Sequence, residues 1–289
     1  MSPISPPMTI IEQALIPKNP AKKSEDGVVV TPDYIAVIDG STSKATRRYS
    51  LFNSNGRYAM QIIARFVRKA GKDLTCHQFC SGVTRAIARH YRKSRLPYLA
   101  DHPEERLTAS CIVYSRLRRE IWMIGDCQCM VGGTFYDNPK PTEEVNAKKR
   151  SAFIKDALTN GKTTEDFQTK DEGRLLILPD IIAGCQKQNV TYAVFDGFPV
   201  YKDGVRMIPC KDCKEIVLSS DGYPFLKNTL AESEQALKDL LTDDPLCIEK
   251  FFATKGLMKG NVSFDDRTYI RLRIGKESGR FGWLRRWIS

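Results

Sequence analysis

The sequence predicts an α+β protein in which helices pack on antiparallel β-sheets. Short runs rich in β-forming residues are separated by turns, and their spacing and hairpin-length connections favour antiparallel pairing. These runs are TASCIVYS at residues 108–115, EIWMIGD at 120–126, RLLILPD at 174–180, TYAVFDG at 191–197, EIVLSSDG at 215–222 and RTYIRLRI at 267–274. The helical patterns fall into separate blocks, at residues 56–95, about 142–160 and 230–241. Because helices do not follow every strand, a strictly alternating βαβ fold is disfavoured.

The first predicted strand is followed by two predicted helices. YIAVIDG at residues 34–40 is typical of a strand, with five apolar or aromatic residues running into Asp39. In residues 56–72 the apolar side chains recur at helical spacing, and the arginines and lysines fall on the other side. Residues 76–95 repeat this pattern. We therefore expect two amphipathic, basic helices that cover a sheet.

The chain is expected to form one domain over residues 24–275. Residues 1–23 lack a basic start followed by an apolar block, so a secretory signal is disfavoured and a flexible arm is expected. No apolar run approaches the 18 or so residues of a membrane span. Residues 134–170 are polar and weakly patterned, which predicts an insertion or flap around one helix. Residues 276–289 form a basic, aromatic tail that we expect to dock on the domain.

The chain contains nine cysteines, an odd number scattered along its length. This distribution is not that of a disulfide framework and, with no secretory signal, indicates a reducing, cytoplasmic location. The pairs Cys127/Cys129 and Cys210/Cys213 are spaced like zinc ligands, but the chain has only three histidines and neither pair has a matching second pair. Small, buried apolar roles are therefore expected for the cysteines.

The positive charge is concentrated in one segment. The formal net charge is +11, and residues 44–95 alone contain thirteen lysines and arginines and a single acid, Asp73. Two neighbouring basic helices are expected to attract acidic or phosphorylated partners. Nucleic acid is the third-ranked partner, because no nucleic-acid-binding motif accompanies the basic segment.

Aspartates stand at the ends of several predicted strands, namely Asp39, Asp126, Asp196 and Asp221, and the pair Asp265 and Asp266 precedes another. Any one of them, Asp196 above all, is compatible with a simple Asp-Gly turn. Together they predict a cluster, because strands packed in a sandwich bring alternate ends to one edge. Clustered carboxylates repel one another unless a cation binds them, and Mg²⁺ or Mn²⁺ take such all-oxygen ligands. Two such ions about 4 Å apart are suited to phosphoryl transfer.

Six short motifs occur in an order that resembles the PP2C-type (PPM) metal-dependent Ser/Thr protein phosphatases. They are SEDG at residues 24–27, AVIDG at 36–40, LTAS at 107–110, IGD at 124–126, LSSDG at 218–222 and DDRTYI at 265–270. The resemblance extends from about residue 24 to 274, nearly the whole chain. It implies an αββα sandwich, in which two antiparallel sheets lie face to face, helices cover both outer faces and metals bind in a cleft at one end.

The resemblance also implies roles for individual residues. Asp39 would bridge two Mg²⁺ or Mn²⁺ ions, and Gly40 would lend its carbonyl to one of them. Asp221 and Asp265 would complete the site of the second ion, and Asp126 with Asp221 would support a third. Asp39, Asp221 and Asp265 are thus the expected catalytic ligands, and the implied nucleophile is the bridging water, which attacks phosphorus in line.

Two further acidic residues match outer positions of the family's site. Glu25 matches an acid that reaches the metals through water, and Asp266 falls where the family often has Asn or Asp. The residue that clamps the substrate phosphate is not assigned, because the arginine that many members carry near the N-terminus has no counterpart here. Lys44 and Arg47 are the candidates for this phosphate-binding role.

The sequence departs from the family after the first aspartate. The family usually continues Asp-Gly with His-Gly-Gly or Met-Gly-Gly, whereas this chain has DGSTSK at residues 39–44. These hydroxyl groups and Lys44 are suited to hydrogen-bonding a phosphate, and the same loop is equally compatible with a protein that has lost activity. Cys127–Cys129 also replace the usual residues after the IGD motif, which leaves the third ion open.

Two functions from different classes are therefore expected. The first is a cytoplasmic, metal-dependent phosphatase that acts on phosphoserine or phosphothreonine in protein substrates. The alternative is a catalytically silent PP2C-like module that binds phosphorylated or acidic partners. The presence of Asp39, Asp221 and Asp265 favours the enzyme, because a silent relative would more often have lost one of them.

Overall fold

The structure is a computed structural model that describes residues 8–42, 44 and 47–275. Its two five-stranded sheets are antiparallel throughout, as the sequence predicts. The first sheet has the strand order β2 (Gly27–Val30), β3 (Tyr34–Gly40), β4 (Ala109–Ser115), β5 (Glu120–Ile124) and β8 (Val205–Pro209). The second sheet has the order β1 (Met8–Ile16), β10 (Arg267–Ile274), β9 (Glu215–Ser219), β6 (Gln128–Val131) and β7 (Thr134–Tyr136). The predicted tail, residues 276–289, lies outside the described residues.

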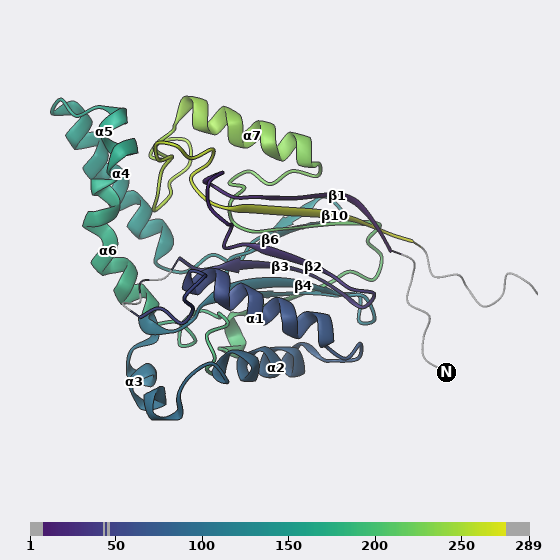
Figure 1. Cartoon of the computed structure of the whole chain (residues 1–289). Helices are drawn as coiled ribbons and strands as arrows, with labels where there is room; N and C mark the ends of the chain where they lie inside the picture. Colours follow the sequence, from purple (N-terminus) through teal and green to yellow (C-terminus); the bar gives the residue numbers. More distant parts are fainter. Residues whose placement is uncertain (1–7, 43, 45–46, 276–289) are drawn as a thin grey trace, which may run out of the picture.

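The two sheets pack face to face, and helices cover both outer faces (Figure 1). Strand β3 shows why its sequence is apolar from Tyr34 to Ile38. Ile35 and Val37 join the core between the sheets, whereas Tyr34, Ala36 and Ile38 pack against the helices on the other side. A central strand covered on both faces has no solvent side on which to place polar residues.

The helices on the outer faces follow the sequence pattern closely. Helices α1 (Asn55–Lys69) and α2 (Cys76–Ala88) cover the first sheet, and α7 (Leu230–Asp243) covers the second. Ser54 caps α1 by accepting a hydrogen bond from the Arg57 amide, and Thr75 forms a capping box with Gln78 at the start of α2. The predicted αββα sandwich is therefore confirmed.

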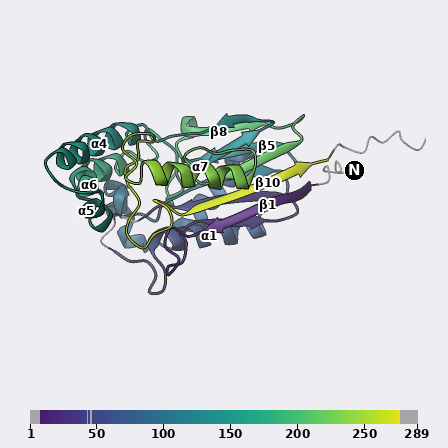
Figure 2. The same ribbon diagram turned by 90° about the horizontal axis from the view of Figure 1, so that it is seen from above.

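A block of three helices stands at one end of the sandwich (Figures 1 and 2). It consists of α4 (Glu143–Thr159), α5 (Thr164–Thr169) and α6 (Glu172–Cys185), and we call it the helical block. The shorter elements are α3 (Leu96–Asp101) and the 3₁₀ turns Lys93–Arg95, Pro103–Glu105 and Lys202–Gly204. Within the described residues, every helix is too short or too polar to cross a membrane.

Two predicted strands are wrong. RLLILPD lies inside α6, where Asp171 caps the helix and only one face is buried, so that Leu175 and Leu176 stay exposed. Its unbroken apolar run therefore does not reflect burial on two faces, which is what a central strand requires. TYAVFDG forms no strand and contributes only two isolated bridges, between Phe195 and Ala109 and between Tyr192 and Gln188. The predicted flap around one helix is accordingly a block of three.

The N-terminal segment also differs from expectation. Residues 8–16 lie in the stretch expected to be a flexible arm, but they form β1, which pairs with β10 from Met8–Ile274 to Ile16–Arg267. A bulge between Ile10 and Glu12 interrupts the register. Backbone hydrogen bonds to an edge of the sheet order this segment, and such bonds leave little trace in composition.

Arg150 anchors the helical block, so its replacement is expected to destabilise the fold. This fully buried side chain donates to Asp171 at 2.7 Å and to the carbonyls of Leu246 and Ala253 at 2.9 and 3.1 Å. Arg150→Met would leave Asp171 charged and buried without its partner, so we expect a loss of about 3–5 kcal/mol in the free energy of unfolding.

Urea denaturation measures this loss. The control is Lys149→Met, which removes an exposed ion pair with Asp180 between the same two helices and should cost about 1 kcal/mol or less. Equal losses in the two variants would contradict the anchoring role of Arg150.

Candidate functional site

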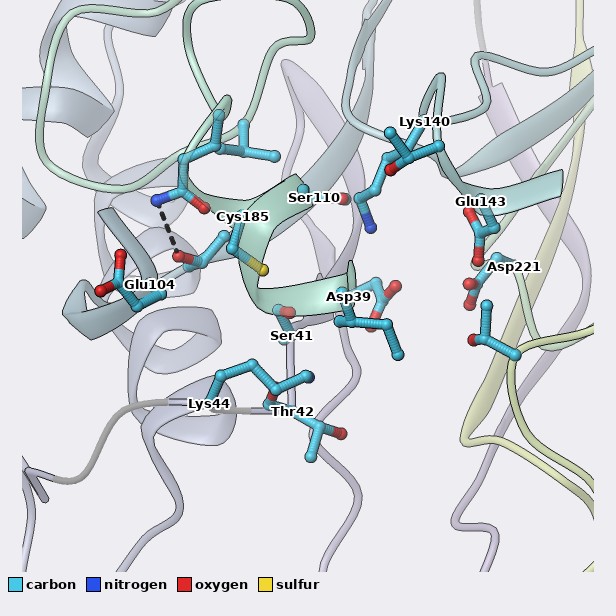
Figure 3. Close-up of a pocket in the computed structure, with 18 of the residues that line it drawn as sticks. Asp39, Ser41, Thr42, Lys44, Glu104, Ser110, Lys140, Glu143, Cys185 and Asp221 are labelled. Carbon is cyan, nitrogen blue, oxygen red and sulfur yellow. Dashed lines mark hydrogen bonds between the residues drawn. The ribbon is translucent and has the colours of Figure 1, made fainter. Parts of the chain in front are cut away.

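A cavity of about 130 Å³ opens where the end of the sandwich meets the helical block (Figure 3). Asp39 is the second-last residue of β3, and Asp221 follows β9 by two residues, so the two sheets bring these carboxylates to one edge. Of the residues proposed from the sequence, Glu25, Asp39, Gly40, Lys44, Asp221, Asp265 and Asp266 line the cavity. Asp126 lies behind its wall, where it contacts Ser110 and Lys140, and Arg47 is not among the lining residues.

The carboxylates at the cavity repel one another. Burial raises the pKa of Asp39 well above its usual range, and the nearby charges of Asp221, Asp26 and Asp126 raise it further. Burial and the charge of Asp126 also raise the pKa of Asp221. Because neighbouring negative charges disfavour ionisation of these carboxylates, a bound cation would stabilise their charged forms.

Three of these acids are arranged to share one cation. Asp126, Glu143 and Asp221 each offer an oxygen, and the three oxygens lie within 4.8 Å of one another. Figure 3 shows the carboxylates of Glu143 and Asp221 side by side. The donor set consists of oxygens only, which fits Mg²⁺ or Mn²⁺ and does not fit zinc in a thiolate site.

Sequence reasoning missed Glu143. It occupies the first turn of α4, where burial raises the pKa of its carboxyl. No motif surrounds it, because it belongs to the weakly patterned insertion. The available signal was the pair of acids at the start of a predicted helix, a position that acids commonly take for reasons unrelated to metals.

Lysines of the chain already contact the cluster. Lys140 donates to Asp126 at 2.5 Å, and Lys18 donates to Asp265 at 3.0 Å. Lys255 forms a second ion pair with Asp265, and its charge also lowers the pKa of Asp221. Burial by itself raises the pKa of Asp126, but Lys140 outweighs that effect and holds the pKa below its usual range. The ammonium groups thus relieve part of the repulsion, and an entering cation has to compete with them.

Asp266 and Glu25 hold the polypeptide around the cavity. Asp266 accepts the backbone amides of Lys18 and Glu25, both at 2.8 Å, and so fixes the segment between β1 and β2. The Glu25 carboxylate accepts the hydroxyls of Thr42 at 2.9 Å and Ser54 at 2.5 Å, which ties the loop after β3 to the start of α1.

Gly40 is required by the packing of this loop. A Cβ atom at Gly40 would lie 2.3 Å from the carbonyl oxygen of Gly56 in α1. The close approach of the two backbones leaves no room for a side chain, which explains the glycine of the AVIDG motif on steric grounds alone.

Asp26 is a second acid that the sequence did not single out. Its buried carboxyl accepts the hydroxyl of Thr268 at 3.0 Å, and burial together with Asp221 and Asp266 raises its pKa to about 7. It lies inside the SEDG motif next to Glu25. The motif therefore identified this position in the chain, but the resemblance assigned a role only to Glu25.

Asp196 and the cysteines take structural roles. Asp196 accepts hydrogen bonds from Arg106 at 2.7 Å and Gln188 at 3.0 Å, away from the other aspartates, and Gly197 follows with φ +85°. Cys127 and Cys129 are buried in the core between the sheets. Within the described residues, the single cluster of three potential metal ligands contains no cysteine.

No family model matches the sequence, and no curated protein matches it. Solved structures that are similar include the Mycobacterium tuberculosis serine/threonine phosphatase PstP/Ppp, with 12% identity and a TM-score of 0.44 over 93% of this chain and 99% of that chain. Stp1, a serine/threonine phosphatase from Staphylococcus aureus, has 14% identity and a TM-score of 0.45 over 96% and 98%. RsbX in complex with magnesium has 10% identity and a TM-score of 0.45 over 93% and 100%. Similarity this distant assigns no function by itself, so the functional argument rests on the residues.

The ion pair of Lys140 generates a prediction about metal affinity. Lys140→Met removes the ammonium group that competes for Asp126, so Mn²⁺ should bind about tenfold more tightly, which corresponds to about 1.4 kcal/mol. Isothermal titration calorimetry measures this affinity. Lys148→Met is the control, because Lys148 pairs with the exposed Glu144 on α4 and should leave the affinity unchanged. An unaltered affinity in Lys140→Met would rule out the competition.

Proposed function

We propose that the chain is a metal-dependent phosphatase that hydrolyses phosphoserine or phosphothreonine in protein substrates. One observation carries the proposal, namely that Asp39, Glu143 and Asp221 line a single cavity and that Asp126, behind its wall, offers an oxygen to the same cluster. The mutual repulsion of these carboxylates and their all-oxygen character favour Mg²⁺ or Mn²⁺. The order of the sequence motifs supports the same chemistry independently.

Asp126, Glu143 and Asp221 would hold one cation. Asp39, the carbonyl of Gly40 and Asp265 are the proposed ligands of the remaining ion or ions, on the basis of the sequence resemblance. When bound, such cations supply an activated water and neutralise charge during phosphoryl transfer.

The chain's own contacts position these groups. Pairing of Asp39 with Ser110 across β3 and β4 fixes the backbone of Asp39, and the Ser110 hydroxyl donates to Asp126 at 2.5 Å and so orients its carboxylate. The carboxylates are therefore held by the sheet itself, which keeps their geometry constant when substrate enters.

A cytoplasmic location is part of the proposal. It rests on the nine cysteines, none of which is in a disulfide in the described residues. Free thiols in this number are typical of a reducing compartment.

The first experiment is hydrolysis of a phosphothreonine peptide with and without Mn²⁺. Asp39→Asn and Asp221→Asn should each reduce kcat/KM about a thousandfold, because bound metal contributes several kcal/mol of transition-state stabilisation. Asp203→Asn is the matched control, an exposed aspartate that also precedes a glycine but lies outside the cavity.

A folded protein that binds Mn²⁺ but turns over none of a varied set of phosphopeptides would contradict the proposal. It would instead favour the catalytically silent module that binds phosphorylated or acidic partners. The observation that favours the silent module is that Lys140 pairs with Asp126 and that Lys18 and Lys255 pair with Asp265. These lysines occupy carboxylates that a metal would otherwise bind.

The basic segment is proposed to select substrates. A groove of about 720 Å³ runs between residues 22–28 and α1 and is lined by Lys22, Lys23, Arg57, Arg65 and Arg68. Its wall includes Ser24, the residue before Glu25, so the groove adjoins the cavity. Acidic residues that flank a phosphorylated side chain would lie in this groove.

Reversing charge in the groove tests this role. In the double variant Arg65→Glu/Arg68→Glu, the KM for a phosphopeptide with acidic flanks should rise about threefold or more, and the effect should shrink at 0.5 M salt because the groove is exposed to solvent. The KM for a peptide with neutral flanks should stay the same. Arg89→Glu, on the exposed face of α2, is the control, and an equal change for both peptides would contradict the proposal.

A further inference from the structure

Two cations without anionic partners among the described residues, Lys44 and Arg174, line the cavity. Lys44 comes from the loop after β3, and Arg174 comes from the first turn of α6 in the helical block. Figure 3 shows the Lys44 side chain on the same side of the cavity as Ser41 and Thr42, extending toward Asp39. The two residues are 130 positions apart in the sequence, and only the docking of the helical block brings them to one cavity.

Their existing contacts are with neutral groups. The Lys44 ammonium donates to the carbonyl of Thr42 at 2.5 Å. Nη1 of Arg174 donates to the carbonyl and hydroxyl oxygens of Thr254, at 2.8 and 3.2 Å. Among the described residues, neither cation takes part in an ion pair, in contrast with Lys18, Lys140 and Lys255. Nε and Nη2 of Arg174 donate to no acceptor in this part of the chain, so a planar donor edge remains available.

Asp171, the N-cap residue of α6, forms its ion pair with Arg150 and not with Arg174, although its charge partly offsets the lowering of the Arg174 pKa by burial. The carboxylate of Asp171 accepts the Arg174 backbone amide at 2.8 Å as a helix cap. Its two oxygens also accept from the buried Arg150 side chain, at 3.2 Å to Oδ1 and 2.7 Å to Oδ2. The charge of Asp171 is thereby balanced by Arg150.

The electrostatic surroundings agree with this arrangement. Burial, together with the nearby charges of Arg174, Lys255 and Lys140, lowers the pKa of Lys44 to about 8. Cations that disfavour one another's charge in a partly buried place are stabilised by an anion that contacts several of them.

We propose that Lys44 and Arg174 form a phosphate clamp that binds the dianionic phosphoryl group of a phosphate monoester. This inference rests on the proposed function, because the clamp holds the substrate against the carboxylate cluster. Ammonium and guanidinium groups are the usual ligands of phosphate, and an arginine adds directional donors. The cavity is lined by both cations and by Asp39 and Asp221, so a phosphoryl group bound by the clamp would lie beside the carboxylates.

The clamp also gives the helical block a role in recognition. Arg174 and Glu143 belong to the block, and Lys140 precedes it by a few residues. The block therefore contributes both a carboxylate and a cation to the lining of the cavity. Without the block, the clamp would lose Arg174 and keep only Lys44.

Binding of inorganic phosphate in the presence of Mn²⁺, measured by calorimetry, tests the clamp without turnover. Lys44→Met and Arg174→Met should each weaken binding about ten- to a hundredfold, the range expected for losing a hydrogen bond to a charged group. Arg174→Lys should retain part of the affinity. Lys170→Met, an exposed cation just before α6, is the control and should bind as the native chain does. Should Arg174→Met fail to fold, Lys44→Met and Arg174→Lys still decide the matter, since neither removes a buried ion pair.

A peptide that carries a non-hydrolysable phosphonate in place of phosphothreonine distinguishes the source of the phosphoryl group. If its affinity falls in the same two variants, the clamp takes phosphoprotein. If only inorganic phosphate depends on them, the clamp stands and its ligand is free phosphate. If both ligands bind the Lys44→Met and Arg174→Met variants as they bind the native chain, the clamp is overturned.

Hydrolysis separates this inference from the proposed function. Turnover by the native chain, together with unchanged phosphate binding in the variants, overturns the clamp and leaves the phosphatase. Clamp-dependent phosphate binding in a chain that hydrolyses no phosphopeptide leaves the clamp and overturns the phosphatase.

Discussion

The repulsion among carboxylates at the open end of the sandwich is the constraint around which the site is organised. The charges of Asp221 and Asp126 disfavour ionisation of Asp39, and the charge of Asp126 disfavours ionisation of Asp221. Carboxylates left in this state would keep a proton or move apart. A hydrogen bond from Ser110 and ion pairs from Lys140 and Lys255 reduce this repulsion. A bound divalent cation would neutralise the negative charge that remains.

The architecture of the sheets produces this convergence. Strands β3 and β9 belong to different sheets, and each is buried along its whole length, so polar groups can appear only where a strand ends. Face-to-face packing then brings the ends of both strands together. Asp266 completes the frame by holding the amides of Lys18 and Glu25, which places the segment before β2 against the same edge.

The helical block adds charges of both signs to this frame. Glu143 extends the acidic cluster, and Arg174 lines the same cavity as Lys44. The block is held by the buried Arg150, which contacts α6 and the carbonyls of two residues in the segment after α7. Arg150 does not line the cavity itself. It stabilises the helical block, and the block supplies Glu143 and Arg174 to the cavity lining.

The sequence patterns alone predicted antiparallel sheets, the helices that cover them and the acids at the strand ends, whereas the αββα sandwich was implied by the resemblance. These features follow from local rules, because a strand buried on both faces must be apolar along its length and a helix on a sheet must show a 3.6-residue period. Asp39 and Asp221 were predictable for that reason, as polar residues that follow such strands.

The tertiary structure decided what the local patterns leave open. Glu143 and Arg174 belong to no motif, and their roles depend on the docking of the helical block. Asp26 lies inside the SEDG motif, but its raised pKa depends on burial in the folded chain. The order of residues 8–16 depends on backbone pairing with β10, to which most sequences are equally suited. The apolar run at residues 174–180 became a helix because its cap and its single buried face outweighed its strand-like composition. Sequence patterns report which groups must be buried, whereas the identity of the groups that meet across the fold is set only when the chain packs.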